Sequence, residues 1–395
     1  MKKYSFDRTN DSTSTTLGEI AEIVMGQSPK GETYNKEGIG VPLINGPTEF
    51  GQRYPNVIQW TTEPTKYCYP NDLLLCVRGS STGRINIANE RYCIGRGVAA
   101  IRPENENIDM LYLNYLVERK VSKMVSLSTG STFPNISSAD IRAFDVNLPS
   151  ITVQKKTGNF VYRLDLKIQK QQEKIELLKV QKTGLMQKIF SQVLRLKDEN
   201  GQEYPKWDIY KLSDFVERVV RKNKELTTKR PLTISAQFGL VDQIEFFNKK
   251  VASANLEGYY LLKHGEFAYN KSYSNGYPWG AIKRLDKYEH GALSTLYICF
   301  STTNNTHSDF LVHYFDSNEW HKEVSLICVE GARNHGLLNV SVTEFFETSH
   351  RLPCLEEQKR ISDFLDSLNK NIQQNEEKLV TLVNQKKGIM QQMFL

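Results

Sequence analysis

A short polar segment in the first half of the chain carries side chains that are suited to chemistry. Residues 78–84 read Arg-Gly-Ser-Ser-Thr-Gly-Arg, so Gly79, Ser81 and Gly83 match the G-x-S-x-G pattern of a nucleophile elbow. A nucleophile elbow turns from a strand into a helix, whereas residues 84–88 (Arg-Ile-Asn-Ile-Ala) alternate like another strand. A serine hydrolase with Ser81 as its nucleophile is therefore the least favoured function.

The same segment is better suited to binding nucleic acid. Its hydroxyl and guanidinium groups can bond phosphates and base edges, and its glycines allow close approach. Residues 271–279 form a comparable segment with a basic start, a glycine and more aromatic side chains. The alternative is that both are ordinary exposed hairpin loops. The candidate DNA contacts are Arg78, Ser80, Ser81, Thr82 and Arg84 in the first half, Lys271, Tyr273, Asn275, Tyr277 and Trp279 in the second, and Arg333, Asn334 and His335 in another polar loop.

Motifs for other chemistry are missing from the sequence. We find no P-loop, no HExxH, no cluster of metal ligands, and neither the glycine-rich loop nor the Asn-Pro-Pro-aromatic motif of a methyltransferase. The six cysteines are scattered without a CxxC pair, which predicts reduced thiols rather than disulfides or a zinc site. We therefore expect a chain without catalysis, metal or cofactor of its own.

The elements that position these segments belong to an internal sequence repeat with two copies. Residues 148–190 align without a gap with residues 352–394, and 17 of these 43 positions are identical, including Gln154/Gln358 and Phe190/Phe394. Upstream, Asn135-Ile136-Ser137 matches Asn339-Val340-Ser341 at the same offset. The 395-residue chain therefore consists of two related halves, each with a strand-rich domain followed by a long helix.

The predicted fold class is α+β, with two repeated β-rich recognition domains, each followed by a long helix. Strands are expected at 73–77, 97–101 and 296–300, and short helices at 110–119, 138–142, 310–315 and 342–346. The predicted organisation is domain 1 at 1–150, the first spacer helix at 151–197, a linker at 198–210, domain 2 at 211–351 and the second spacer helix at 352–395.

Both long helices carry apolar residues at alternating steps of three and four, which is typical of a coiled-coil seam. Polar residues interrupt the two seams at equivalent places, Gln171/Asn375 and Lys182/Lys386. We expect an antiparallel coiled coil in which Gln171 faces Lys386 and Asn375 faces Lys182, so that these residues fix the register. The alternative is two separate amphipathic helices, each packed on its own domain.

The positive charge of the chain is concentrated in one stretch. The net charge is +6, and residues 151–192 hold nine Lys/Arg against three acids while the remainder is balanced. This excess is typical of a helix that passes close to a polyanion, although a solvated helix face would look the same. No apolar run reaches the roughly 18–20 residues of a membrane span, so we expect a cytoplasmic protein without membrane contact.

The architecture and several local patterns resemble the specificity subunits of type I restriction-modification systems across nearly the whole chain. The patterns are LGEIAEIVMGQSP at the start of the first domain, NDLLLCVRGSSTG around its strand-turn, and RLPCLEEQKRISDFLD before the second helix. The central strand-turn of the second domain departs from the family pattern, which makes the loop at 271–279 the weaker assignment.

The resemblance implies a non-catalytic subunit that recognises a bipartite, asymmetric site in double-stranded DNA. It also implies two modification subunits that methylate adenine with S-adenosylmethionine, and restriction subunits that use ATP and magnesium. The runner-up function is a nucleic-acid adaptor or coiled-coil scaffold without sequence specificity.

Overall fold

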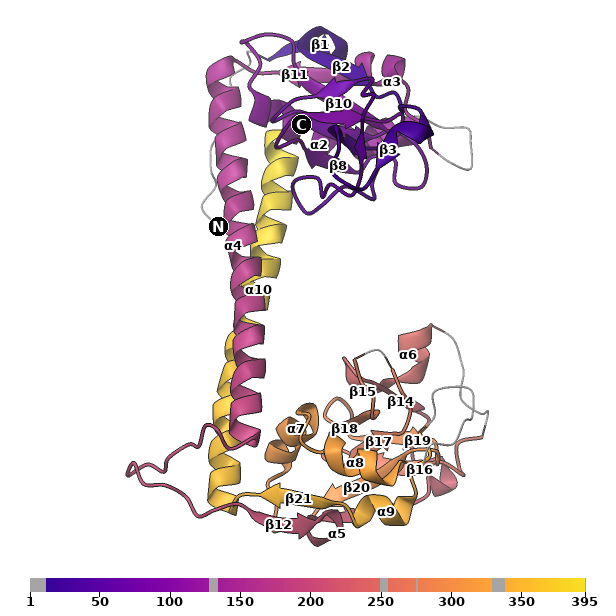
Figure 1. The fold of residues 1–395 in the computed structure, drawn as a ribbon, viewed down its shortest axis with the longest axis vertical. Helices are drawn as coiled ribbons and strands as arrows, with labels where there is room; N and C mark the ends of the chain where they lie inside the picture. Colours follow the sequence, from indigo (N-terminus) through magenta and orange to yellow (C-terminus); the bar gives the residue numbers. More distant parts are fainter. Residues whose placement is uncertain (1–11, 128–133, 249–254, 275, 329–337, 395) are drawn as a thin grey trace. The chain divides into compact units, whose positions relative to one another are not determined.

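The computed structural model describes residues 12–127, 134–248, 255–274, 276–328 and 338–394. It divides into two compact units: unit 1 comprises Met1–Glu173 and Glu377–Leu395, and unit 2 comprises Lys174–Glu376. The two long helices are α4 (Ile151–Phe190) and α10 (Leu355–Met393) (Figure 1). Each of them therefore contributes to both units.

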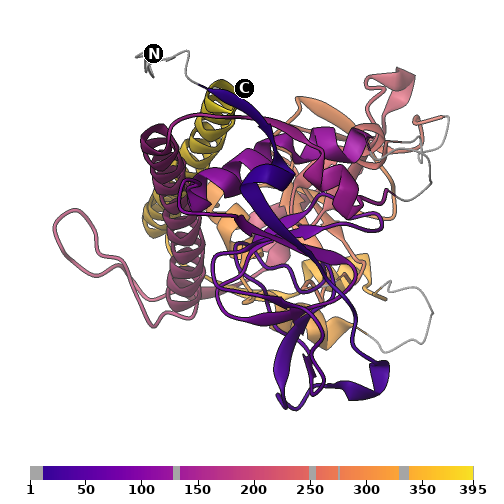
Figure 2. The ribbon, with the colours of Figure 1, turned by 90° about the horizontal axis from the view of Figure 1, so that it is seen from above.

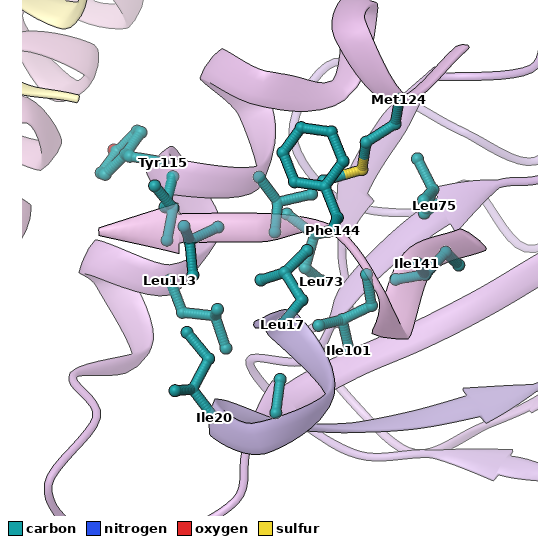
Figure 3. Close-up of a cluster of buried hydrophobic side chains, with 14 of the residues drawn as sticks. Leu17, Ile20, Leu73, Leu75, Ile101, Leu113, Tyr115, Met124, Ile141 and Phe144 are labelled. Carbon is teal, nitrogen blue, oxygen red and sulfur yellow. The ribbon is translucent and has the colours of Figure 1, made fainter. Parts of the chain in front are cut away.

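The centre of unit 1 is an antiparallel sheet in the order β2-β10-β7-β8. Leu73 and Leu75 of β7 belong to an apolar cluster on one face, with Leu113 and Met124 of helix α2 (Figure 3). Leu74 belongs to a second cluster. Because side chains alternate between the two faces, β7 is buried on both sides. The elements are β2 (Ala21–Met25), β7 (Leu73–Cys76), β8 (Ile85–Ile87), β10 (Val98–Pro103) and α2 (Met110–Leu127).

Smaller elements complete unit 1. A five-stranded arrangement in the order β3-β5-β4-β9-β6 lies beside the central sheet, and strand β1 pairs with β11. These elements are β1 (Thr13–Thr16), α1 (Leu17–Ile20), β3 (Tyr34–Asn35), β4 (Val41–Ile44), β5 (Trp60–Thr61), β6 (Tyr67–Cys68), β9 (Tyr92–Ile94), α3 (Ser138–Arg142) and β11 (Asp145–Leu148).

Unit 2 repeats this plan. Its central sheet has the order β13-β20-β17-β18, and β12 pairs with β21 as β1 pairs with β11. The equivalent elements are β12 (Asp208–Lys211), α5 (Leu212–Phe215), β13 (Val216–Arg218), β17 (Phe267–Asn270), β18 (Ala281–Arg284), β20 (Ile298–Thr302), α7 (Ser308–Asp316), α8 (His321–Ile327), α9 (Val342–Phe346) and β21 (Ser349–Leu352).

The second layer differs between the units. In unit 2 it consists of two antiparallel two-stranded sheets, β14-β15 and β16-β19, in place of the five-stranded arrangement. The strands are β14 (Leu232–Ser235), β15 (Gly239–Asp242), β16 (Tyr260–Lys263) and β19 (His290–Leu293), and helix α6 (Gln243–Phe247) follows β15.

The long helices run antiparallel within each unit, where their segments lie side by side (Figures 1 and 2). In unit 1, Phe160 and Val161 near the start of α4 share a core cluster with Met390 and with Phe394, just beyond the end of α10. In unit 2, Phe190 at the end of α4 shares a cluster with Ile361 and Leu365 near the start of α10. Each domain therefore packs against both helices, which excludes the alternative of two separate helix-domain pairs.

Most predicted elements are present, and three helix boundaries differ. The predicted helices at 138–142 and 342–346 are confirmed, and the one at 110–119 extends to Leu127. Helix α10 begins at Leu355, three residues later than predicted, because Leu352 still pairs with Asp208 in the β12–β21 ladder. Helix α4 ends at Phe190, and Gln192 has a positive φ of 61°.

Three further observations concern the cysteines, the apolarity of the helices and the placement of metal-ligating side chains. All six cysteines are free, and four of them are buried. Among the described residues, no helix is both long and apolar enough to cross a membrane. Within the same ranges, no group of three or more His, Cys, Asp or Glu side chains is placed to hold a metal ion.

Candidate nucleic-acid interface

One end of the central sheet of unit 1 gathers the polar segments. Cys76, at the end of β7, pairs with Val98 at the start of β10, and Met25 at the end of β2 pairs with Ala99. The segments that follow β2 and β7 and the one that precedes β10 therefore emerge at the same end. Backbone hydrogen bonds fasten them there, with Gly26 N–H donating to Val98 (2.9 Å) and Val77 N–H donating to the oxygen of Gly97 (2.9 Å).

The predicted loop at 78–84 connects β7 and β8. Gly79 and Gly83 have positive φ values of 83° and 93°, as the tight connection requires. The Thr82 hydroxyl donates to the oxygens of Gly79 (2.7 Å) and Pro134 (2.9 Å), which fixes the loop from inside. Arg78 and Ser80 are exposed, and Ser81 is half-buried. The segment leads into a strand, so it lacks the strand-to-helix turn of a nucleophile elbow.

Arg84 supports a neighbouring loop that the sequence analysis did not single out. Its guanidinium donates to the oxygens of Pro47 (3.2 Å) and Phe50 (3.3 Å), and Asn86 Nδ2 donates to the oxygen of Gly51 (3.0 Å). These bonds hold residues 47–56, which we name the bracket loop. Little in the sequence indicated that Arg84 contacts this loop, because no local pattern links Arg84 to a segment more than thirty residues earlier.

The bracket loop also contacts the long helix within unit 1. The Arg53 guanidinium lies over the ring of Tyr162 on α4 at 4.8 Å, and Gln52 Nε2 donates to Gln172 Oε1 (2.7 Å). Between this loop, α2 and the helix segments lies a cavity of about 920 Å³. Its lining includes Arg53, Asn114 and Lys386. Polar contacts of the bracket loop thus join the sheet domain of unit 1 to α4.

In unit 2 the predicted loop at 271–279 connects β17 and β18. Backbone hydrogen bonds between Ser274 and Tyr277 close it (2.8 and 3.3 Å), and Gly280 has a φ of 78°. Lys271 Nζ donates to the oxygen of Val340 (3.2 Å), and burial lowers the pKa of this lysine. Tyr273 is 59% exposed and is the most exposed of the described candidates in this loop.

The remaining residues of this set are placed differently. Trp279 packs against the main core cluster of unit 2, and Tyr277 packs against the second cluster. Asn275, Arg333, Asn334 and His335 lie outside the described residues.

The two predicted loops occupy equivalent positions. Each connects the third and fourth strands of its sheet, β7 to β8 and β17 to β18. The neighbouring connections also correspond. In unit 2, β13 ends and β20 begins at the end of the sheet where β17 leads into the loop, because Arg218 pairs with Phe300 and Tyr269 with Ile298. The structure therefore presents the same set of connections twice, with different side chains.

A repeated glutamine attaches each domain to the start of its helix. Gln154 Nε2 donates to the oxygen of Pro149 (2.8 Å), and its Oε1 accepts from Asp109 N–H (2.9 Å) at the start of α2. Gln358 makes the same bonds to Pro353 (2.9 Å) and from His307 N–H (2.9 Å). Both glutamines are buried. We call this pair of bonds the glutamine clasp.

The two lysines of the seam have acidic partners that the sequence analysis did not predict. Lys386 Nζ pairs with Asp165 (2.9 Å) and Glu118 (3.0 Å), and Asp165 lies six residues before Gln171, which is itself buried. Burial is the strongest influence on the pKa of Lys386 and lowers it, but the two carboxylates together raise it.

In unit 2, Lys182 interacts electrostatically with Asp316 and Asp366, while burial lowers its pKa. The Asn375 carboxamide donates to Asn371 of its own helix (2.7 and 2.8 Å). Both lysines are therefore drawn to acids, because a buried ammonium gains more from a carboxylate than from an amide.

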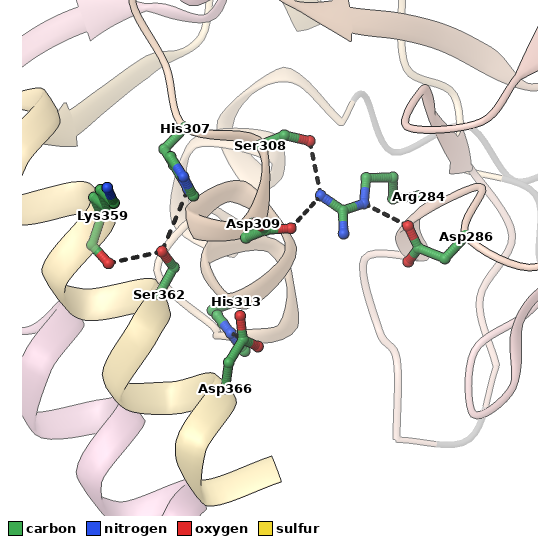
Figure 4. A network of polar contacts seen from close by, with 9 residues as sticks. All are labelled: Arg284, Asp286, His307, Ser308, Asp309, His313, Lys359, Ser362 and Asp366. Carbon is green, nitrogen blue, oxygen red and sulfur yellow. Dashed lines mark hydrogen bonds and ion pairs between the residues drawn. The ribbon is translucent and has the colours of Figure 1, made fainter. Parts of the chain in front are cut away.

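A network of histidines and acids joins α7 to α10 in unit 2 (Figure 4). His313 Nε2 bonds Asp366 Oδ1 (2.9 Å), and His307 Nδ1 bonds the Ser362 hydroxyl (3.3 Å). Burial lowers the pKa of His313 more than Asp366 raises it, so its neutral form is favoured. Beside it, Arg284 pairs with Asp286 (2.6 Å) and Asp309 (2.7 Å).

The sequence was compared with known protein families. Residues 10–179 match the model of the type I restriction modification DNA specificity domain. The specificity subunit of type I restriction enzyme MjaVIII from Methanocaldococcus jannaschii is 26% identical over 152 residues, which cover 37% of this chain and 36% of that protein. A protein of the same organism named for the specificity subunit of type I restriction enzyme MjaX is 34% identical over 176 residues, which cover 45% of this chain and 41% of that protein. The chain spans less than half the length of either relative.

The fold was compared with solved structures. The crystal structure of a type I restriction-modification S subunit from M. genitalium covers 99% of this chain, and 98% of its own chain is matched, with a TM-score of 0.56 and 15% identity. At this identity the likeness concerns the fold alone, and it includes both halves of the chain. Residues 10–179 are thus similar to the type I restriction modification DNA specificity domain, and the second half of the chain is built on the same plan as the first.

Proposed function

We propose that this chain is the DNA-recognition subunit of a type I restriction-modification system, in which each unit recognises one half of a bipartite site. The observation that carries the proposal is the pair of loops at 78–84 and 271–279. They occupy equivalent positions in two sheets of the same order, but they present different side chains. Two such loops are suited to reading two different half-site sequences, because base choice depends on the side chains that a common backbone presents.

In this proposal the chain has no catalytic activity of its own. Two modification subunits would supply adenine methylation with S-adenosylmethionine, and restriction subunits would supply cleavage with ATP and magnesium. The helix pair would separate the two recognition domains and carry the partner subunits. The basic stretch at 151–192, with nine Lys/Arg and three acids, would favour a position close to the phosphates.

The decisive experiment is a domain exchange read by methylome sequencing. Residues 17–147 are replaced with the corresponding domain of a relative, and the variant is expressed with the modification subunits. We expect one half of the methylated motif to change and the other half to stay the same. If both halves changed together, or if no motif were methylated by the wild-type complex, the proposal of two independent reading domains would be wrong.

The runner-up, an adaptor without sequence preference, is separated by selection of bound duplexes from a random pool. A specificity subunit enriches two short motifs at fixed spacing, whereas an adaptor enriches none. The double variant Arg78→Ala/Ser80→Ala is a matched probe, because both side chains are exposed and can be removed without opening the core. It should blur the first motif and leave the second intact.

A further inference from the structure

The cavity of unit 1 contains polar groups that the fold leaves unused. Its volume of about 920 Å³ lies within the range of small-molecule sites. Seven of its lining residues are Asn or Gln, and two of these, Asn86 and Asn114, are buried. Within the described ranges, neither Asn86 Oδ1 nor Asn114 Oδ1 accepts a hydrogen bond. Buried polar groups without a partner are rare and costly in folded proteins, so these two oxygens need an explanation.

Asn114 is the more informative of the two. It lies on the face of α2 that also carries Leu111 and Glu118, and all three residues line the cavity. Asn114 is 7% exposed, and neither its oxygen nor its nitrogen makes a hydrogen bond among the described residues. Asn86 Nδ2, in contrast, already donates to the oxygen of Gly51. A turn about the Cβ–Cγ bond, which is a soft torsion, brings either end of the Asn114 carboxamide to the cavity.

The internal repeat indicates that the fold does not require a carboxamide at this position. The glutamine clasp makes Asp109 equivalent to His307, so Asn114 is equivalent to Val312 of α7. Val312 packs against the main core cluster of unit 2. An apolar side chain therefore serves the packing of the helix there, whereas a carboxamide in its place is suited to binding a ligand.

The charges around the cavity balance one another. Lys386 Nζ is paired with Asp165 and Glu118, and the Arg53 guanidinium lies over the ring of Tyr162. The lining thus contains two cations and two acids, which favours neither an anion nor a cation as the ligand. Its other side chains, apart from the carboxamides, are aliphatic or aromatic. This combination fits an uncharged planar heterocycle, which packs on apolar surfaces and bonds carboxamides through its edge.

The Asn114 carboxamide selects among such heterocycles. It offers a donor beside an acceptor, and the adenine edge with N6 and N7 offers the complementary pair, which Asn binds bidentately. The second N–H of the adenine amino group then needs another acceptor, and Asn86 Oδ1 can serve as that acceptor. We propose that the cavity binds a free adenine nucleoside, with the edge of its base on Asn114.

The position of the cavity favours a free ligand over a base of the recognised duplex. No residue of the predicted DNA-contacting loop at 78–84 lines the cavity. Asn71, Leu73 and Ile87 line it instead, and they lie at the other end of strands β7 and β8. The inference therefore goes beyond the proposed function and does not depend on DNA recognition.

The test is a calorimetric titration of the purified full chain with adenosine in the absence of DNA. Purine riboside, which lacks the amino group, is the matched ligand. Asn114→Val introduces the side chain of the equivalent position in unit 2, and Arg119→Gln, at an exposed position of α2 outside the cavity, is the control. Thermal denaturation measures the stability of each variant, and hydrogen exchange with and without adenosine locates the ligand.

We expect saturable one-to-one binding of adenosine. Purine riboside should bind at least about tenfold more weakly, because the hydrogen bonds of the amino group are lost. Asn114→Val should weaken adenosine binding by a similar factor. It should keep or raise the midpoint of thermal denaturation, because it removes a buried group without a partner. Arg119→Gln should bind adenosine like the wild type, and adenosine should slow hydrogen exchange in α2 and the bracket loop.

The inference is overturned if adenosine does not bind, if purine riboside binds equally well, or if Asn114→Val binds adenosine as tightly as the wild type. The comparison of the two ligands uses the wild-type chain, so it does not depend on how the variant folds. A duplex with one unpaired adenine tests the other source of the base: if it binds through Asn114 and free adenosine does not bind, the free ligand is wrong. A chain that binds adenosine but selects no DNA motif would refute the proposed function and leave this inference standing.

Discussion

Each unit receives the end of a long helix from the other half of the chain. The apolar contacts of that helix end are the same in the two units, whereas the polar contacts around it are only partly alike. In unit 1, Phe394 lies against Tyr112 of α2, with ring centroids 5.0 Å apart. In unit 2, Phe190 lies against Phe310 and Tyr314 of α7, both at 5.7 Å. Phe190 and Phe394 are equivalent in the internal repeat, so the apolar contact was kept while the two halves diverged.

The polar contacts were kept only in part. In unit 1, Lys386 lies between Asp165 and Glu118, and in unit 2 its repeat equivalent Lys182 interacts with Asp316 and Asp366. Unit 2 also contains imidazoles in this region, because all seven histidines of the chain lie within residues 264–350 and His313 bonds Asp366. The comparison teaches that the shape of the apolar contact sets the fold, whereas the polar contacts around it can be rebuilt. It also predicts that the units respond differently to substitution and to pH.

The largest effect should come from truncating the terminal aromatic residues. Phe394 and Phe190 are 2% and 3% exposed, so changing either to Ala should lower the free energy of unfolding of one unit by about 3–5 kcal/mol. Phe394→Ala should loosen unit 1, although residue 394 belongs to the second half of the sequence, and Phe190→Ala should loosen unit 2. Hydrogen exchange followed by mass spectrometry measures the two units separately.

Val380→Ala is the control for this pair, because Val380 lies on the same helix as the residues before Phe394 but is 59% exposed. It should leave exchange unchanged in both units. If Phe394→Ala speeded hydrogen exchange in unit 2 alone, the packing of Phe394 in the core of unit 1 would be contradicted.

The glutamine clasp should matter equally in both units. Gln154→Ala removes the partners of the Asp109 N–H and the Pro149 oxygen, and Gln358→Ala does the same for His307 and Pro353. Leaving such groups unpaired costs about 2–3 kcal/mol, so both variants should lower the denaturation midpoint of their unit by similar amounts. Gln391→Ala, at an exposed position of α10, should have no effect. A large loss in one variant only would show that the clasp is not equivalent.

Acid should weaken unit 2 before unit 1. Burial lowers the pKa of His350 to about 4, and its ring nitrogens bond the hydroxyls of Tyr314 and Thr348, both at 2.8 Å. The neutral form is favoured in the folded state, so the stabilisation is complete above the unfolded pKa of about 6.5 and declines as the pH falls towards 4. At pH 5 the loss of stabilisation amounts to about 2 kcal/mol. Hydrogen exchange at pH 7 and pH 5, corrected for intrinsic rates, compares the units.

His350→Gln should flatten the pH dependence of unit 2, because the glutamine side chain does not titrate. Unit 1, which has no histidine, is the internal control in the same sample. Equal loss of protection in both units would contradict the assignment of acid sensitivity to the imidazoles.

The smallest effect concerns the bracket loop. Arg84→Ala removes the two hydrogen bonds to Pro47 and Phe50, so it should cost about 1 kcal/mol of selectivity at the first half-site. The second half-site should stay the same. Competition binding with single-base variants measures both. If the preference for the first half-site survives unchanged, the bracket loop does not contribute to recognition.

Much of the fold could be predicted because its signals are local or repeated. Short apolar runs between turn residues predicted β7 and β10, and the internal repeat predicted that the helices match. The repeat also predicted helix α9 from its counterpart α3.

Contacts between distant segments could not be predicted in the same way. The partner of Lys386 was expected to be Gln171, since the seam was assumed to be symmetric about its polar residues. The structure shows Lys386 paired with Asp165 and Glu118. Both acids lie far from Lys386 in the sequence, so no local pattern indicated them. The role of Arg84 in holding residues 47–50 was missed for the same reason.

The exchange of helix ends has a consequence for how such a gene can be built. Unit 1 is completed by Phe394 and unit 2 by Phe190, so neither half of the gene encodes a finished domain. A half-length product that ends near residue 197 would contain one domain and one helix, and its own Phe190 is the repeat equivalent of the missing Phe394. Two copies of that product could complete each other, and we expect a fragment of residues 1–197 to have the mass of a dimer in light scattering. Such a pair would present the same domain twice and so favour a palindromic site, and fusing and then diverging the copies would make the site asymmetric.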